Sequence, residues 1–218
     1  MSLAPAFPLG TTFLPGDAVV LRVFESRYLE LLHDALENDR TFVTALIAAG
    51  SEVGGGDKRF DSGVLVEIDH VEEAEIGLML YGHATEPVNI RYWNDERSYP
   101  QAKFEIQFQT IGTDFLSDCT TALSSFVIEL DQFFSFLNEM KIPTPTPPGF
   151  VRSLVPSNAA PATAETHTDL FWALARLLPC TAMARFELLV DQPLTMRIQR
   201  ALAEIQHMRE IVTFRYGN

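Results

Sequence analysis

The chain has 218 residues, of which 47% are apolar, and it carries a formal net charge of −13 at pH 7. A chain of this length and composition can fill one or two hydrophobic cores without disulfide or metal staples. Its acidic surface disfavours contact with the phosphate backbone of nucleic acids and with anionic membrane surfaces. We therefore expect no nucleic-acid partner and no membrane partner, and solubility is the simplest role for the charge.

The two cysteines, Cys119 and Cys180, lie far apart and form no C-x-x-C motif. Both stand among apolar residues, which predicts buried, unreactive thiols in a reducing compartment. No apolar run approaches the ~18 residues of a membrane-spanning helix, and the N-terminus has no basic region followed by an apolar one. These features predict a cytoplasmic protein.

The first half of the chain is rich in strand patterns. Six segments are continuously apolar or alternate in polarity: residues 18–24, 42–49, 63–68, 76–81, 88–93 and 103–109. In the last of these, Phe104, Ile106 and Phe108 point one way and polar residues point the other. Gly82 and Pro87 separate the fourth strand from the fifth. Short strands at this spacing predict a closed or nearly closed barrel.

One helix is expected to interrupt the strands, at residues 26–38. Its apolar residues fall on a single helical face: Tyr28, Leu31, Leu32, Ala35 and Leu36. Ser26 stands at the start of this pattern and is the predicted N-cap.

The second half of the chain predicts helices. Apolar residues spaced alternately three and four apart form an a/d seam over residues 114–140: Leu116, Cys119, Leu123, Phe126, Leu130, Phe133 and Leu137. Prolines after residue 142 end that helix, and residues 150–165 are expected to be irregular.

Further helices are expected at residues 168–178, at residues 181–190 and from Pro193, as first helical residue, to about residue 213. In the last helix the polar residues Arg197, Arg200, Glu204 and Arg209 are expected to face away from the apolar side. We therefore expect a β-rich pseudobarrel over residues 1–112 and an α-helical bundle over residues 113–218.

Motifs for catalysis are missing from the sequence. Residues 50–59 superficially resemble a phosphate-binding loop, but no glycine there precedes a lysine, and Arg59 follows Lys58 where Ser or Thr is needed. No H-E-x-x-H, G-x-S-x-G or S-x-x-K motif occurs. His167 and Asp169 are more typical of a helix cap than of a metal site. We therefore expect no enzyme, no cofactor and no metal.

Three aromatic residues, Tyr92, Trp93 and Tyr99, are candidates for contact with a bound peptide. Adjacent strand residues point to opposite faces, so one of Tyr92 and Trp93 is expected to be buried and the other exposed. Packing in the core or over a sheet edge is the simpler interpretation of all three, and peptide contact is the sharper one.

Short motifs open the chain in a fixed order: Phe7-Pro8-Leu9-Gly10, Phe13-Leu14-Pro15-Gly16, a strand ending at Phe24, and Glu25-Ser26-Arg27-Tyr28. In this order they resemble the opening of the N-terminal substrate-binding domain of Lon-type proteases. Later, Arg91-Tyr92-Trp93 and Tyr99-Pro100-Gln101-Ala102 resemble that family's R-x-x-W to Y-P-x-A stretch, and residues 174–179 resemble its A-x-L-L-P helix. The sequence departs from the pattern at Ser26, where Pro is usual, and at Leu14, where Phe is common.

The resemblance implies an α+β fold, a PUA-like β pseudobarrel followed by a C-terminal α-helical bundle. Nine residues of the matching motifs are expected to serve the architecture: Phe7, Pro8, Leu9, Pro15, Gly16, Phe24, Glu25, Arg27 and Tyr28. Pro15-Gly16 predicts a turn before a strand, and Tyr28 is expected to bury its ring between barrel and helix.

The resemblance also implies a free-standing relative of a domain that helps Lon proteases capture unfolded substrates, here without their ATPase and protease domains. We expect a non-catalytic module that binds unfolded or extended polypeptide, or other proteins, at an open strand edge or in a groove. A small-molecule binder or enzyme using a cleft between barrel and bundle is the alternative. RNA binding would need a basic face, and a scaffold or oligomerisation role could use the heptad seam. The partner and the oligomeric state stay open.

Overall fold

The computed structural model describes residues 1–50, 56–107, 116–147, 149–155 and 163–217. It divides the chain into two compact units, residues 1–107 with 181–191, and residues 108–180 with 192–218. The middle of the glycine-rich segment and the predicted boundary at residue 112 lie outside the described residues.

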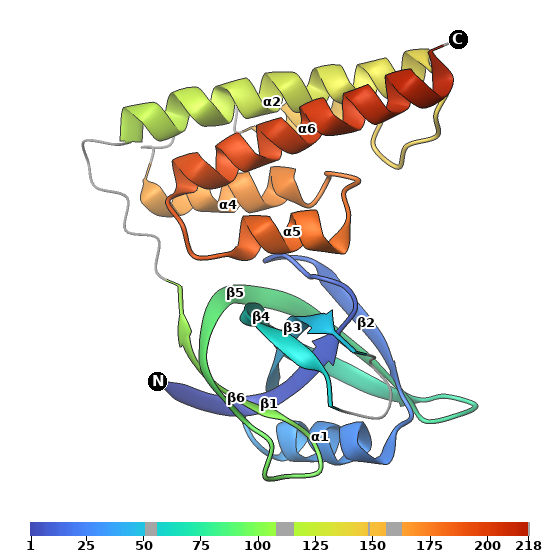
Figure 1. Cartoon of the computed structure of the whole chain (residues 1–218), viewed down its shortest axis with the longest axis vertical. Helices are drawn as coiled ribbons and strands as arrows, with labels where there is room; N and C mark the ends of the chain where they lie inside the picture. Colours follow the sequence, from blue (N-terminus) through green and yellow to red (C-terminus); the bar gives the residue numbers. More distant parts are fainter. Residues whose placement is uncertain (51–55, 108–115, 148, 156–162, 218) are drawn as a thin grey trace. The chain divides into compact units, whose positions relative to one another are not determined.

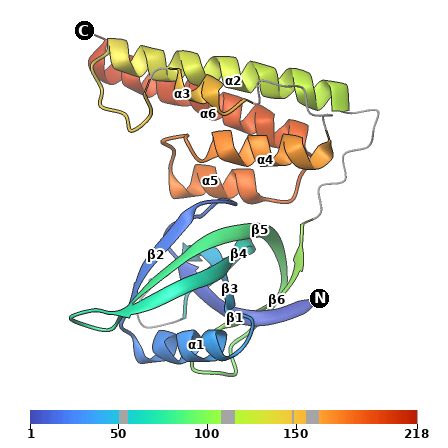
Figure 2. The ribbon, with the colours of Figure 1, turned by 180° about the vertical axis from the view of Figure 1, so that it is seen from behind.

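The first unit is built on a six-stranded mixed sheet (Figures 1 and 2). Its strands are β1 Ser2–Leu9, β2 Ala18–Val23, β3 Thr41–Ala49, β4 Lys58–Glu73, β5 Leu78–Asn94 and β6 Gln101–Ile106. The strand order is β2-β5-β4-β3-β1-β6, and an additional pairing of β5 with β6 closes the last five strands into a ring. Only β1 and β3 pair in parallel among the described strands. The predicted α+β fold, a pseudobarrel followed by helices, is confirmed.

Strand β1 was not expected from the sequence, since Pro5 and Pro8 argue against a paired strand. The structure accommodates both prolines because each half of β1 pairs along one edge. Residues 2–5 pair with β6, and residues 6–9 pair with β3. A proline is tolerated where the strand has a free edge for the missing N–H.

Strand β5 is one long strand where the sequence predicted two, at residues 76–81 and 88–93. Gly82 lies inside the strand at a point where β4 comes too close for a side chain. A Cβ there would stand 2.4 Å from the carbonyl oxygen of Glu67 on β4. Pro87 is tolerated beside a register shift in the β4–β5 ladder, between Val64 and Val66. The two residues that looked like strand breaks are thus a close approach and a bulge.

Helix α1, Ser26–Glu37, lies against one end of the ring (Figure 1) and buries the predicted apolar face, including Tyr28 and Leu31. The prediction of Ser26 as N-cap is wrong, because Glu25 occupies that position. The Glu25 side chain does not cap the helix. It pairs instead with Arg27, at 3.2 Å.

Helix α5, Ala182–Leu189, belongs to the pseudobarrel unit although it lies among the helices of the second half of the sequence. Phe186 stacks on Phe60 of β4 with ring centroids 4.2 Å apart. Arg185 donates a hydrogen bond to the carbonyl oxygen of Thr12 at 2.9 Å and forms an ion pair with Asp17. These contacts attach the helix to the turn that precedes β2.

The second unit contains α2 Leu116–Glu139, α3 Phe150–Ser153, α4 Ala164–Ala175 and α6 Leu194–Tyr216. Helices α2 and α6 lie side by side (Figures 1 and 2). Leu116, the first residue of the predicted α2 seam, is only half-buried, and the other six are buried: Cys119, Leu123, Phe126, Leu130, Phe133 and Leu137. Arg197 on α6, predicted to face away, is fully buried, and its guanidinium lies 4.9 Å from the ring centroid of Trp172. Contact with this aromatic face lets a long cationic side chain enter the core.

Three local predictions in this unit are corrected. The cap of α4 is a capping box between Thr163 and Thr166, while the buried His167 hydrogen-bonds to Thr163 and Thr120. Pro193 is the N-cap of α6 and not its first helical residue. Helix α3 forms inside the segment expected to be irregular.

Candidate functional site

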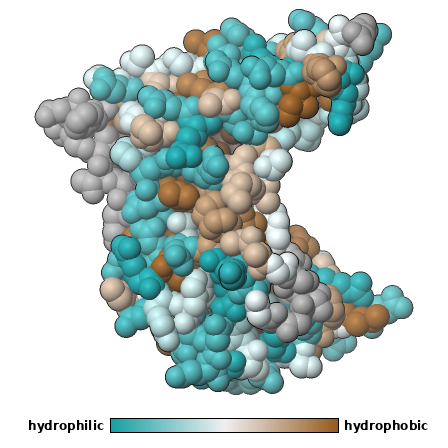
Figure 3. All heavy atoms as spheres, in the orientation of Figure 1, coloured by the Kyte–Doolittle hydropathy of each residue, from teal (hydrophilic) through white to brown (hydrophobic). Residues whose placement is uncertain are grey.

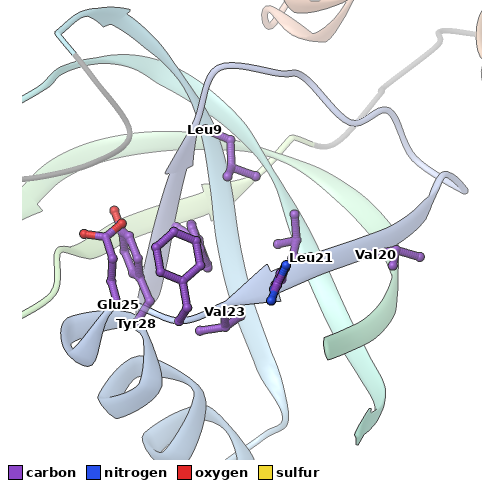
Figure 4. A pocket seen from close by; sticks show the side chains of 9 residues that line it. Leu9, Val20, Leu21, Val23, Glu25 and Tyr28 are labelled. Atoms are coloured by element: carbon purple, nitrogen blue, oxygen red, sulfur yellow. The ribbon is translucent and has the colours of Figure 1, made fainter. Parts of the chain in front are cut away.

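A groove of about 230 Å³ lies between β1, β2 and the start of α1 (Figure 4), and we call it the β1–β2 groove. Nine residues line it: Phe7, Leu9, Val20, Leu21, Arg22, Val23, Phe24, Glu25 and Tyr28. Strand β2 is antiparallel to β5, β5 is antiparallel to β6, and β6 is antiparallel to β1, so β1 and β2 run in opposite directions. Within the described part of the chain they do not pair with each other, because β2 bonds only to β5. The groove is therefore the place where the sheet stays open.

The floor of the groove is aromatic and packed. The rings of Phe7 and Tyr28 stack with centroids 4.0 Å apart and planes 14° apart. The guanidinium of Arg27 lies 4.3 Å from the Tyr28 ring centroid and is fixed by its pairing with Glu25. Burial raises the pKa of Tyr28 to about 12, so its phenol stays neutral at neutral pH.

The lip of the groove on β2 is apolar and exposed. Val19 and Val23 point into the core, whereas Val20 is 51% exposed and Phe24 is 53% exposed. Ile76 in the β4–β5 turn is 63% exposed, and its carbonyl oxygen accepts a hydrogen bond from Arg22 Nε at 3.2 Å. Apolar side chains thus flank a strand edge at which alternate residues present backbone N–H and C=O groups.

The groove contains few side chains that could act as an ionised nucleophile or bind a metal ion. Its ionisable side chains are Arg22, Glu25 and the neutral phenol of Tyr28. In the described residues of the whole chain, no three His, Cys, Asp or Glu side chains gather in a group that could hold a metal ion. At about 230 Å³, the groove is also smaller than the roughly 300–1,000 Å³ typical of small-molecule sites. A groove of this size and lining suits one or two apolar side chains of a ligand together with the backbone that carries them.

The three aromatic residues predicted as peptide contacts all lie outside this groove. Tyr92 is 62% exposed and stands in one cross-strand row with Lys103 and Leu3. Trp93 is half-buried, with the Arg59 guanidinium 4.8 Å from its ring centroid. Tyr99 is enclosed, at 2% exposed.

The hydroxyl of Tyr99 donates to Asp34 on α1 and accepts a hydrogen bond from Arg97 at 2.8 Å. Burial, followed by the hydrogen bond to Asp34, raises the pKa of Tyr99. Next to it, Ser98 donates to Glu30, also on α1. These bonds tie the β5–β6 loop to the helix, and we call them the α1–loop contact. Tyr99 therefore has a structural role in this conformation.

Motif residues that were expected to serve the architecture line the groove as well: Phe7, Leu9, Phe24, Glu25 and Tyr28. Pro15 and Gly16 form the predicted turn before β2, in which Gly16 takes the left-handed backbone conformation at φ 85°. The family motif thus builds the groove by fixing its floor and by positioning β2.

Sequence reasoning missed Val20, Leu21 and Ile76 as candidate residues. One signal was present, since residues 18–24 are apolar at both parities of a strand. Such a run normally means that both faces are covered. Here no described element covers the outward face at Val20 and Phe24, so these side chains stay exposed.

A β pseudobarrel followed by C-terminal helices is the fold of Lon N-terminal domains. The model of the ATP-dependent protease La (LON) substrate-binding domain matches residues 4–207. The chain therefore belongs to the LON substrate-binding domain family. No curated protein matches the chain.

Two solved structures show the same fold. A Lon N-terminal domain protein from Xanthomonas campestris is 20% identical, with a TM-score of 0.59 over 93% of this chain and 98% of that chain. The N-terminal domain of a Mycobacterium avium complex Lon protease is 13% identical, with a TM-score of 0.67 over 94% and 98%. The family match concerns a substrate-binding domain and includes neither an ATPase nor a protease domain. In the described residues, no helix is long and apolar enough to cross a membrane.

Proposed function

We propose that this protein is a non-catalytic polypeptide-binding module that takes extended, apolar segments of unfolded proteins at the β1–β2 groove. The observation that supports this most directly is the open edge of β2 beside exposed Val20 and Phe24. An extended peptide gains main-chain hydrogen bonds by adding a strand to such an edge. Its alternate side chains would then face the apolar groove and supply the selectivity.

The floor of the groove favours binding without rearrangement. The stacked Phe7 and Tyr28 rings are buried among other core residues, and Arg27 is held between Tyr28 and Glu25. A rigid apolar surface binds with a smaller loss of side-chain entropy than a flexible one. Because the bound groups are backbone and apolar side chains, the module accepts many sequences that expose such segments.

The test is binding of a fluorescein-labelled, permanently unfolded protein, followed by anisotropy. Val20→Asp and Phe24→Asp place a charge where the peptide would pack, and each is expected to weaken binding at least tenfold. Both residues are about half exposed, so folding should tolerate the changes, which circular dichroism checks.

The matched control is Phe214→Asp, the same substitution at a phenylalanine that is 92% exposed near the end of α6. It should bind the unfolded protein as the unmodified chain does. Equal affinity for all three variants, or no saturable binding of several unfolded proteins, would refute the proposed function.

A further inference from the structure

We infer that the segment bound in the β1–β2 groove is basic at its N-terminal end and runs antiparallel to β2. This inference rests on the proposed function, because it names the chemistry of the ligand for the same site. It comes from the carboxylates at the turn of the β4–β5 hairpin, which stands beside the C-terminal end of β2.

The hairpin turn lies directly against the end of β2. A Cβ at Gly77 would stand 2.1 Å from the carbonyl oxygen of Val23, so only glycine allows this approach. Arg22 donates to the Ile76 carbonyl oxygen, and Val23 pairs with Leu78. A strand added to β2 would therefore pass the hairpin turn at one of its ends.

Three exposed carboxylates surround this turn: Glu72, Glu73 and Glu75. Among the described residues, neither Glu73 nor Glu75 forms an ion pair, and Glu72 meets only His70, at 3.5 Å. In Figure 3, hydrophobic and hydrophilic atoms lie side by side at the end of this hairpin, which projects from the barrel in Figures 1 and 2. An apolar lip thus ends in a cluster of negative charge.

The charge of the whole pseudobarrel unit acts in the same direction. Residues 1–107 and 181–191 contain 9 Lys and Arg against 20 Asp and Glu, a net charge of −11. Complementary charge raises association rates and excludes partners of like charge. A second copy of this chain is equally acidic, which disfavours it as the occupant of this edge.

The polarity follows from strand pairing. Antiparallel pairs are slightly more stable than parallel ones and two- to three-fold more common. A segment antiparallel to β2 places its N-terminal end beside the C-terminal end of β2, where the hairpin turn lies. Lysine or arginine at that end would stand nearer to the three carboxylates than the same residues at the other end, although β2 and β5 lie between the added strand and Glu72 and Glu73 on β4.

The experiment compares labelled peptides of about eight residues that alternate valine with threonine. Two lysines stand at the N-terminal end, two lysines stand at the C-terminal end, or two glutamates replace the N-terminal lysines. At an ionic strength of about 0.1 M, the N-terminal lysine peptide should bind about fivefold more tightly than either other peptide. At about 1 M the difference should nearly vanish.

Two triple variants separate local from general charge. Glu72→Gln with Glu73→Gln and Glu75→Gln should abolish the preference for the N-terminal lysine peptide. Asp61→Asn with Glu86→Gln and Glu96→Gln changes the net charge equally at exposed carboxylates that do not line the groove, and it should retain the preference.

Each contrary result has one meaning. If all three peptides bind equally, or if both triple variants lose the preference alike, this inference is wrong and the proposed function stands. Tighter binding of the C-terminal lysine peptide also overturns it. A dimer of the chain that every peptide dissociates would identify a second copy as the occupant and overturn it. If no peptide binds, the proposed function itself fails.

Discussion

The two ends of helix α1 meet the pseudobarrel in different ways. At its start, Tyr28 stacks on Phe7 and forms the floor of a groove whose upper side, on β2, stays open. Toward its end, Asp34 binds the Tyr99 hydroxyl and the Arg97 guanidinium and thereby closes the helix against the β5–β6 loop. At the C-terminal end of α1 the polar groups are hydrogen-bonded within the protein. At its N-terminal end an apolar surface stays exposed and the edge of β2 stays unpaired.

The difference indicates which end is available to a partner. At the α1–loop contact, binding a ligand would first require breaking hydrogen bonds to a carboxylate, which are among the stronger ones. At the β1–β2 groove, binding removes exposed apolar area from water and pairs free backbone groups. Aromatic content alone did not distinguish these cases, because Tyr28 and Tyr99 are both buried.

The largest effect is expected from Phe7→Ala, which removes the groove floor. Phe7 is buried and contacts the rings of Tyr28 and Phe42, so the loss in free energy of unfolding should be about 3–5 kcal/mol. Urea unfolding followed by circular dichroism measures it. Phe214→Ala, at an exposed phenylalanine, should change stability by less than about 0.5 kcal/mol. Similar losses for both would mean that the groove floor is not part of the core.

A second effect is expected at alkaline pH. The pKa of Tyr28 is about 12 in the folded chain, against 10.0 for an unperturbed tyrosine, so the unfolded chain loses this proton first. The stability from keeping the phenol neutral is present below pH 10 and is lost as the pH rises toward 12, about 2–3 kcal/mol in total. The free energy of unfolding should therefore fall more steeply with rising pH in the unmodified chain than in Tyr28→Phe. Parallel curves for the two proteins would contradict this.

At the other end of α1, Tyr99→Phe should cost about 1–2 kcal/mol, because it removes the hydrogen bond that the hydroxyl donates to Asp34 and the one that it accepts from Arg97. Peptide affinity should not change, since the ring stays enclosed. Tyr92→Phe, on the exposed face of β5, serves as control and should alter neither quantity. A loss of peptide binding in Tyr99→Phe would show that Tyr99 contacts the peptide, as the sequence suggested.

The smallest effect is expected on the lip of the groove. Val20→Thr should change the free energy of unfolding by less than about 0.5 kcal/mol, since half of this side chain is exposed and threonine suits a strand. Val19→Thr, one residue earlier and fully buried, should cost about 1–3 kcal/mol because it buries a hydroxyl. Equal costs would show that the outward face of β2 is covered after all.

Much of the fold was predictable because its signals are local. The alternation of Phe104 and Ile106, the helical face of α1 and the heptad seam of α2 each follow from the backbone geometry of one element. The misreadings occurred where tertiary contacts override a local rule. Pro87 and Gly82 looked like breaks in β5. Arg197 looked like a solvent-facing residue, but in the structure it is buried against the ring of Trp172.

The candidate site was predictable only in part. The opening motifs singled out Phe7, Glu25 and Tyr28, which all line the groove, but the sequence assigned them only an architectural role. The exposed lip at Val20 could not be recognised, because exposure depends on whether another strand covers β2. No local pattern in the sequence says that β1 and β2 remain unpaired.

The sequence by itself determined the acidic charge, the strand and helix periodicities and the family motifs, because these depend on residue type and spacing alone. Only the tertiary structure decided that β1 divides its pairing between β3 and β6, that α5 joins the barrel, and that β2 keeps an open edge. Pairing between distant strands depends on ring closure, which is a property of the whole sheet and not of any one segment.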